Sequence, residues 1–290
     1  MPRARELKAA ATAQQPAAWM KELSPRRREL IRPVIENPRE FVLLSVRAAA
    51  ARLKTDPATM VRVVQRMGFD SYRAFQNYLH DMSIANATSL DGMVQTTKPD
   101  IPSYLDATIK QDVQNLHAVR TSLDARRLAA LAQRVHAARR LLLVGGDLAE
   151  NLVHYFEHHF TIIGLPVLVA TTVGRSLHIT RSIGKGDLVM AISFRKGLRQ
   201  TVDGMRRARA NGAYCVGITG THVSPIARLA DEYFIAPVES NSFIDSYVAP
   251  MALANMILVA CANYDREASL AYLREAAEEQ RSGYRWYEPD

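Results

Sequence analysis

Residues 141–147 read LLLVGGD, a run of four aliphatic residues that ends in two glycines and an aspartate. A short aliphatic run that stops at a glycine pair is typical of a buried strand that turns directly into a helix. Residues 188–200, LVMAISFRKGLRQ, repeat this arrangement with a longer and basic turn. Because strands that are apolar on both faces must be covered on both faces, the two segments predict a parallel sheet with helices on each side.

Strand-like apolar runs alternate with helical periodicity through the rest of the C-terminal half. Strands are expected at 140–144, 166–170, 188–193, 214–219 and 232–235. Helices are expected at 125–138, 147–163, 198–211 and 247–264, with shorter helical segments at 176–181 and from 224. We therefore predict a doubly wound parallel-sheet domain, flavodoxin-like or Rossmann-like, over 125–265, followed by a C-terminal helix and tail over 266–290.

The N-terminal third of the chain carries helix signals only. N-cap residues precede apolar periodic segments at Ser24, Ser45 and Asp56, and helices are expected at 26–35, 46–53, 56–67 and 72–82. We predict a flexible tail over 1–18, an all-helical domain over 19–88, and a linker with a connecting helix over 89–124. The linker is indicated by turn-forming residues between 83 and 102, and the connecting helix is expected at 103–123. The predicted fold class is thus α + α/β.

The positive charge gathers in the N-terminal domain. The chain carries 37 Lys+Arg and 29 Asp+Glu, a net charge of +8, of which +7 falls within residues 1–88. This concentration favours nucleic acid or an acidic membrane surface as the partner of the first domain, although a solvated basic face would give the same count.

Composition excludes several classes of protein. An apolar fraction of 48% excludes a disordered or fibrous chain. Two cysteines are too few for a disulfide framework or a zinc site, and no apolar run reaches the length of a membrane span or a signal peptide. We expect a cytoplasmic protein that does not enter the membrane.

Helix 46–53, the three residues 54–56 and the next helix have the layout of a helix-turn-helix. Side chains on the exposed face of the second helix would read base edges, and neighbouring cations would contact phosphates. The candidate DNA-binding residues are Arg47, Lys54, Thr55, Ala58, Thr59, Arg62, Arg66 and Arg73. Any pair of helices can match this spacing by chance, so the charge concentration supplies the second argument.

The same segment resembles the N-terminal domain of RpiR-type bacterial transcriptional regulators, a group that includes MurR. The resemblance is carried by residues 44–46 with Ala50, by the helix start DPATMVR at 56–62, and by MGFDSYRAF at 67–75. The element Gly-Phe-x-x-Tyr-x-x-Phe is its most specific part. Two residues depart from the family pattern, since Lys54 replaces a usual glycine in the turn and Thr55 replaces a usual apolar residue.

The turns after two predicted strands carry candidate ligand-binding residues. Ligands of open α/β sheets bind at the carboxyl ends of the strands, where backbone N–H groups and cations would suit a phosphate or a carboxylate. A plain tight turn and a solvated basic loop are the simpler alternatives. The candidates are Gly145, Gly146, Asp147, Ser193, Arg195, Lys196, Arg199 and Thr201.

This half resembles the sugar isomerase (SIS) domain, the phosphosugar-binding module of RpiR-type regulators. The usual pattern has a glycine and a serine in the first loop and Ser-x-Ser-Gly-x-Thr in the second. Here Asp147 and Ala149 stand at the glycine and serine positions of the first loop, and Arg195-Lys196 replaces Ser-Gly in the second. Of these positions, only Ser193 matches the usual pattern. We therefore expect a ligand with more negative charge, held by arginine or lysine.

Other polar residues give weaker signals. His154 and His158 have the spacing of a helical metal pair but lack a third ligand, so no metal and no cofactor are expected. Glu157, His178 and Glu239 could serve acid–base chemistry, and Asp245 could line the crevice.

The combined prediction is a sequence-specific DNA-binding regulator, not an enzyme, whose SIS-like domain senses a sugar phosphate or sugar acid. Its expected partners are a double-stranded operator, a small anionic effector and further copies of the chain in a homodimer or homotetramer. A sugar-phosphate isomerase with an appended helical domain is the first alternative. An adaptor that binds RNA or a membrane surface by charge alone is the second.

Overall fold

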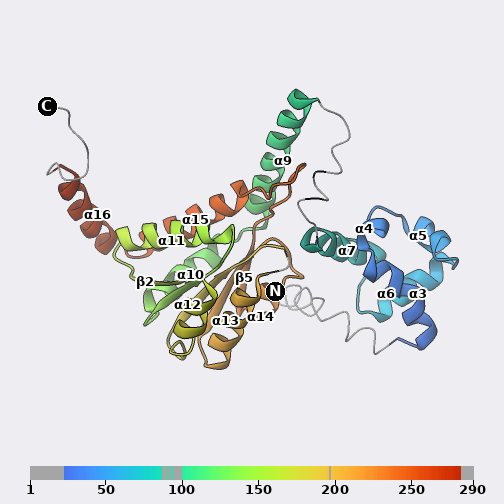
Figure 1. Ribbon diagram of the computed structural model, residues 1–290, viewed down its shortest axis with the longest axis horizontal. Helices are drawn as coiled ribbons and strands as arrows, with labels where there is room; N and C mark the ends of the chain where they lie inside the picture. Colours follow the sequence, from blue (N-terminus) through green and yellow to red (C-terminus); the bar gives the residue numbers. More distant parts are fainter. Residues whose placement is uncertain (1–22, 87–89, 91–92, 94–99, 196, 282–290) are drawn as a thin grey trace. The chain divides into compact units, whose positions relative to one another are not determined.

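The computed structural model describes residues 23–86, 90, 93, 100–195 and 197–281 (Figure 1). The chain divides into two compact units. We call them the N-terminal unit, described over 23–86 together with 221–224, and the C-terminal unit, described over 90, 93, 100–195, 197–220 and 225–281.

The N-terminal unit is all-helical. Its helices are α3 (Pro25–Glu36), α4 (Pro38–Phe41), α5 (Val46–Arg52), α6 (Pro57–Arg66) and α7 (Tyr72–Asn86). The apolar faces meet in one core that includes Ile31, Met60, Phe75 and Leu79, each completely shielded from solvent. Helix α7 continues past its predicted end at Met82, so residues 83–86 are helical and do not start a linker. The Ser83 hydroxyl donates to the Leu79 carbonyl (2.8 Å), which satisfies this polar side chain without breaking the helix.

The C-terminal unit alternates strands and helices. Its strands are β1 (Leu141–Val144), β2 (Val167–Ala170), β3 (Leu188–Ile192), β4 (Tyr214–Thr219) and β5 (Glu232–Ile235). Its helices are α9 (Ile101–Ser122), α10 (Ala125–Ala137), α11 (Ala149–Ile162), α12 (Val173–Ile179), α13 (Arg199–Ala210), α14 (Pro225–Leu229), α15 (Val248–Tyr264) and α16 (Arg266–Arg281). These agree with the predicted elements to within a few residues. Helix α12 begins earlier than predicted because the Thr172 hydroxyl caps it by accepting from the Arg175 N–H.

The sheet is parallel and has the strand order β2-β1-β3-β4-β5. Strand β1 lies between β2 and β3, with Val144 opposite Ala170 on one side and Ala191 on the other. The chain therefore winds outward in opposite directions from β1 and β3. Open sheets of this order bind ligands at that reversal, beyond the carboxyl ends of the two strands.

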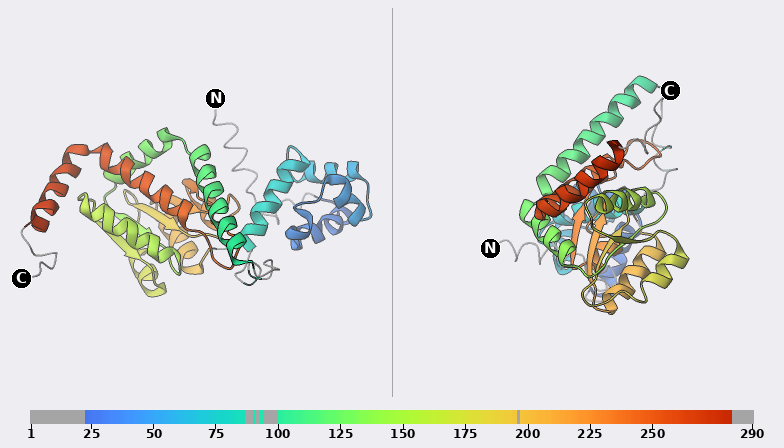
Figure 2. Two further views of the ribbon diagram at one scale, coloured as in Figure 1. Left: turned by 90° about the horizontal axis from the view of Figure 1, so that it is seen from above. Right: turned by 90° about the vertical axis from the view of Figure 1, so that its left-hand side faces the viewer.

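Helices cover both faces of the sheet, as Figures 1 and 2 show. Leu141 and Leu143 face the core formed with α10, α11 and α15, whereas Leu142 and Val144 face the core formed with α12, α13 and α14. This alternation follows from the two-residue period of a strand. It explains why the strands read as unbroken apolar runs.

No single helix in the described part of the chain is both long and apolar enough to cross a membrane. Helices α15 and α16 satisfy the length and composition criteria only as a pair, with a bend of 105° between them.

A buried carboxylate joins segments at the amino-terminal edge of the sheet. Asp187, completely buried, accepts hydrogen bonds from Arg139 Nη2 (2.9 Å), Arg140 Nη2 (2.7 Å) and the Gly184 N–H (2.9 Å). Burial alone would raise the pKa of Asp187, but these hydrogen bonds outweigh it and hold the pKa well below its ordinary range.

Replacing this carboxylate gives a stability prediction. Asp187→Asn should lower the free energy of unfolding by about 2–4 kcal/mol near neutral pH, because two guanidinium groups lose their shared partner. A carboxylate with a lowered pKa stabilises the fold above its unfolded pKa of about 4, and that contribution is lost as the pH falls through the native pKa. Denaturant unfolding between acid and neutral pH should therefore show the two proteins converging in acid. Asp203→Asn, which removes an exposed partner of Arg206, is the control and should cost under about 0.5 kcal/mol; an equal loss in both variants would contradict the account.

Candidate functional site

Helices α5 and α6 form a helix-turn-helix whose two starts are capped by side chains. The Ser45 hydroxyl accepts from the Ala48 N–H (3.2 Å), and Asp56 Oδ1 accepts from the Thr59 N–H (2.8 Å). Ala49 and Ala50 of α5 are buried, and small side chains at these positions allow α5 to lie close to α6.

The candidate DNA-binding residues lie mainly on the surface. Arg47, Lys54, Ala58, Arg62, Arg66 and Arg73 are exposed, and Thr55 and Thr59 are half-buried. On α6 the exposed face holds Ala58, Arg62 and Arg66, opposite the buried Met60, Val63 and Val64. The side chains on the face that would enter a DNA groove therefore do not contribute to the hydrophobic core.

Thr59 and Arg62 are engaged with each other on this face. The Thr59 hydroxyl donates to Asp56 Oδ2 (2.6 Å) and accepts from Arg62 Nη2 (3.1 Å), while Arg62 Nε donates to the Ala58 carbonyl (3.3 Å). The hydrogen bonds from Thr59 lower the pKa of Asp56, so this cap is ionised at neutral pH. Because all these contacts are exposed, Arg62 can exchange them for contacts to a base at little cost.

The element 68–75 has a structural role that explains its pattern. Gly68 ends α6 with a φ of 91°, a left-handed conformation that favours glycine. The rings of Phe69 and Phe75 meet edge to face with centroids 5.2 Å apart in the core, and the Tyr72 hydroxyl donates to the Leu44 carbonyl (3.3 Å). The element thus fixes α7 against the segment that leads into α5.

Lys54 adopts a left-handed backbone with a φ of 53° in the turn between the two helices. This conformation costs a non-glycine residue about 1 kcal/mol of free energy, and it costs a β-branched residue more. The cost explains why glycine is the usual residue at this position. We expect Lys54→Gly to leave the free energy of unfolding within about 1 kcal/mol of the wild-type value, and Lys54→Val to lower it by about 2 kcal/mol. Thermal unfolding of the three proteins measures this order. A valine variant as stable as the glycine variant would show that the turn does not impose this conformation.

At the reversal of the sheet, Gly145 and Gly146 follow β1 in positions with no room for a side chain. A Cβ at Gly145 would lie 2.7 Å from Val153 Cγ2, and a Cβ at Gly146 would lie 2.3 Å from Gln200 Nε2. Gln200 also donates to the Thr171 carbonyl (2.7 Å). The glycines therefore let the loops after β1, β2 and β3 converge.

The loop after β3 places the cationic side chain of Arg195 at this edge of the sheet. Arg195 has a φ of 53°, and its Nε donates to Asp245 Oδ1 (2.6 Å), fifty residues further along the chain. Its Nη2 contacts the same carboxylate, whereas its Nη1 is buried without a partner. Ser193 is buried, and its hydroxyl accepts from the Leu198 N–H (3.3 Å), which shapes the turn.

Among the described residues, five side-chain atoms are buried without a hydrogen-bond partner; two of them belong to Thr221 and to Ser269 of α16, and the other three lie at this edge of the sheet. Besides Arg195 Nη1, the hydroxyls of Thr201, in the first turn of α13, and Thr219, the last residue of β4, are buried without a hydrogen-bond partner. Both threonines are fully shielded from solvent. Because a buried polar group without a partner costs free energy, such a group in a native fold indicates a missing bound molecule or water.

Tyr247, the residue before α15, adds a phenol to this edge. Its ring contacts Phe194 with centroids 5.2 Å apart. Burial, followed by the nearby carboxylates Asp245 and Asp147, raises its pKa, so the phenol stays protonated and can donate a hydrogen bond at neutral pH. This edge of the sheet therefore brings together a cation, threonine hydroxyls and a phenol, which are donors that suit an oxygen-rich anion.

Known proteins are similar to this chain in both of its halves. A family model described as the SIS domain matches residues 135–260. An HTH-type transcriptional regulator of Caldanaerobacter subterraneus is 21% identical over 260 residues, which cover 88% of this chain and 92% of the relative. The chain therefore has a SIS domain over residues 135–260 and resembles HTH-type transcriptional regulators along most of its length.

Two solved structures share the fold of this chain. The Vibrio vulnificus NanR protein, complexed with ManNAc-6P, is 20% identical with a TM-score of 0.59, and the match covers 93% of this chain and 97% of NanR. The sugar isomerase domain of an RpiR transcription factor from Sphaerobacter thermophilus is 24% identical with a TM-score of 0.56, covering 59% of this chain and 96% of that domain.

The remaining candidate ligand residues of the chain occupy different places. Asp147 is exposed in the first loop with a φ of 54°, a conformation that accounts for the glycine of the usual SIS pattern there. Arg199 is exposed and lines a groove between α12 and α13, which Gln200 also lines. Lys196 lies outside the described residues.

His154 of α11 pairs with two acidic neighbours on the same helix. His154 Nδ1 lies 2.7 Å from Glu157 Oε2 and its Nε2 lies 3.5 Å from Glu150 Oε1, and the hydrogen bond to Glu157 is the main reason that its pKa is raised. No group of three potential metal ligands occurs among the residues that the structure describes.

Thr219 and Tyr247 were missed by the sequence patterns. Thr219 could have been found because it is the last residue of a predicted strand, as the candidate Ser193 is. Tyr247 had no such signal, since a long loop after β5 carries it to the site.

Proposed function

We propose that the N-terminal unit of this chain binds a specific double-stranded DNA operator and that its C-terminal unit binds a sugar phosphate or sugar acid which changes the affinity for DNA. The observation that carries the proposal is the set of three unpartnered buried polar groups, on Arg195, Thr201 and Thr219, in a chain that also has a basic helix-turn-helix. The complex of the related NanR protein with ManNAc-6P supports this class of ligand.

Arg195 would supply the main contact to the anion. One nitrogen of its guanidinium is free of partners while Asp245 fixes the others, so the group is already oriented. The hydroxyls of Thr201 and Thr219 would exchange hydrogen bonds with the hydroxyl groups of the sugar. An arginine in place of a serine and glycine suits a carboxylate or phosphate better than a neutral sugar.

Asp245 would pass the ligand signal to α9, the helix that follows the N-terminal unit along the chain. Its loop, residues 239–246, is bound to α9 by hydrogen bonds from Asn115 Nδ2 to the Glu239 carbonyl (2.8 Å), from Asn241 Nδ2 to the Ala107 carbonyl (2.8 Å), and from the Ser246 hydroxyl to Asp112 Oδ1 (2.5 Å). A ligand that shares Arg195 with Asp245 would therefore act on the contacts of α9.

A homodimer or homotetramer would present paired DNA-binding units to the two halves of an operator. Helix α9 offers an apolar stripe for this association, because exposed residues recur every three or four positions along one face. They are Ile101, Leu105, Ile109, Val113 and Leu116. We also propose the domain bounds 19–88 for the DNA-binding domain and 125–265 for the SIS domain, joined by 89–124.

We propose that the chain is not an enzyme. Of the groups considered for acid–base chemistry, Glu157 pairs with His154 on α11 and His178 is exposed on α12, whereas Glu239 lies in the loop that also carries Asp245. Asp245, which is at the crevice, is paired with Arg195. A sugar-phosphate isomerase is the alternative, and a turnover assay with aldose and ketose phosphates tests it.

The DNA part of the proposal is tested by selecting duplexes from a random pool with the full chain. Enrichment of one sequence motif, ideally with two-fold symmetry, is expected. If every competitor duplex displaces the bound duplex equally well, the N-terminal unit binds DNA through its charge alone. That result would favour the adaptor alternative.

A further inference from the structure

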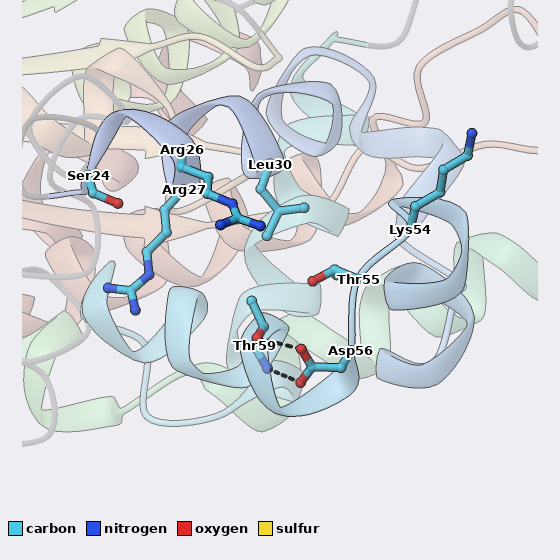
Figure 3. A pocket seen from close by; sticks show the side chains of 8 residues that line it. All are labelled: Ser24, Arg26, Arg27, Leu30, Lys54, Thr55, Asp56 and Thr59. Carbon is cyan, nitrogen blue, oxygen red and sulfur yellow. Dashed lines mark hydrogen bonds between the residues drawn. The ribbon is translucent and has the colours of Figure 1, made fainter.

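The helix-turn-helix borders a cleft of about 650 Å³ that no sequence pattern indicated. Figure 3 shows side chains from α3 on one side of this cleft and side chains from the turn and α6 on the other. The lining residues are Ser24, Arg26, Arg27, Leu30, Lys54, Thr55, Asp56 and Thr59. We call it the α3–α6 cleft.

The cleft carries positive charge that the fold does not neutralise. Within the described residues, no carboxylate forms an ion pair with Arg26, Arg27 or Lys54, although all three line the cleft. Asp56 is the opposing charge, and both of its oxygens accept hydrogen bonds from Thr59. By contrast, Arg32 on the same helix lies 3.0 Å from Glu29 Oε2 and 3.9 Å from Glu36 Oε1.

The cleft flanks the face of α6 that would read DNA. Thr59 lines the cleft and lies one residue after the exposed Ala58, about 100° around the helix from it. A helix with its side chains is roughly 10–12 Å wide and nearly fills a major groove of about 12 Å, so one phosphate backbone must run along each flank. The α3–α6 cleft therefore faces the path of one backbone when α6 lies in the groove.

We propose that the α3–α6 cleft seats a phosphate of the DNA backbone, bound by the Arg26 and Arg27 guanidinium groups from α3 and by the Thr55 hydroxyl from the turn. Lys54 lines the cleft, but Figure 3 shows its ammonium end pointing away from the other lining side chains, so the ammonium is not part of this contact. The proposal rests on the proposed DNA-binding function and adds α3 to the interface. Such a contact sets the register of α6 in the groove and carries no base preference of its own.

The test is the salt dependence of DNA binding by full-length Arg26→Gln/Arg27→Gln. Its probes are a duplex selected from a random pool by the wild-type chain and an unrelated duplex. Each phosphate contact contributes roughly 0.9 to the slope of log K against log salt concentration, so we expect the slope to fall by about one to two. Affinity for the two duplexes should fall by a similar factor, on the order of ten-fold at low salt.

Arg32→Gln is the control, because it removes one guanidinium charge from the same helix at a site outside the cleft, and it is matched in charge to the single variant Arg26→Gln. Its salt slope should equal that of the wild-type chain. A double variant whose slope matches Arg32→Gln would overturn the cleft proposal while leaving the DNA-binding function intact, whereas a wild-type chain that binds no duplex would overturn both. Thermal unfolding checks the fold, and the single variant Arg26→Gln, at an exposed position, repeats the test if the double variant unfolds.

Discussion

Arg62→Ala should weaken binding to the preferred duplex by about 1–3 kcal/mol, a factor of roughly 5 to 150, and should weaken binding to unrelated duplexes far less. The reason is the position of Arg62 on the exposed face of α6, where its guanidinium can exchange the contacts to Thr59 and the Ala58 carbonyl for a base edge. Competition mobility shifts with single-base variants of the duplex measure this, and the loss should be confined to one base position in each half-site.

Arg66→Ala is the comparison for this result. Arg66 lies in the last turn of the same helix and is also exposed, but we place it at a phosphate. Its loss should reduce affinity for all duplexes alike and lower the salt slope by about one. If Arg62→Ala behaved in the same uniform way, base readout by Arg62 would be refuted.

Arg195→Gln should reduce affinity for an anionic sugar ligand by about 10- to 150-fold, which corresponds to the roughly 1.5–3 kcal/mol of a hydrogen bond to a charged group. DNA binding without ligand should persist, because Arg195 belongs to the C-terminal unit. Thermal-shift titration with a panel of sugar phosphates and sugar acids measures the loss. Arg199→Gln, an exposed cation two residues beyond Gly197, is the matched control, and an equal loss there would place the anion in the groove between α12 and α13 instead.

Thr219→Val separates ligand binding from folding at the same site. The Thr219 hydroxyl is buried without a partner, so its replacement by a methyl group should raise the free energy of unfolding of the ligand-free chain by about 1 kcal/mol. The same change should weaken ligand binding, because the hydroxyl would hydrogen-bond the sugar. Opposite signs for the two measurements are expected; a variant that loses stability would show that the hydroxyl already has a partner in the ligand-free protein.

The sequence was sufficient to predict the local elements and the edge of the sheet that forms the site. Aliphatic runs such as 141–144 fix strands, and a helix start such as Asp56-Pro57 fixes a helix, because both depend on neighbouring residues. The unusual backbone at Lys54, Asp147 and Arg195 also has a sequence correlate, since each occupies or adjoins a place where the related family has glycine.

Contacts between distant residues were not predictable in this way. The pair of Arg195 with Asp245 joins positions fifty residues apart, and nothing in either local pattern names the other. The α3–α6 cleft likewise arises because α3 lies beside the turn before α6, a consequence of packing around residues such as Met60 and Phe75. Local patterns therefore indicate which loops meet at the sheet edge, whereas the partners of each side chain follow from the tertiary fold.

The central claim is that one chain couples an anionic sugar ligand to operator DNA. The most direct test is a mobility-shift titration of the full chain on its selected duplex, repeated in the presence of each member of a panel of sugar phosphates and sugar acids. One ligand should change the apparent affinity for DNA in the wild-type chain, and Arg195→Gln should abolish the change at the same ligand concentration. Specific binding that no member of the panel alters, together with turnover of a sugar phosphate by the same preparation, would contradict the claim.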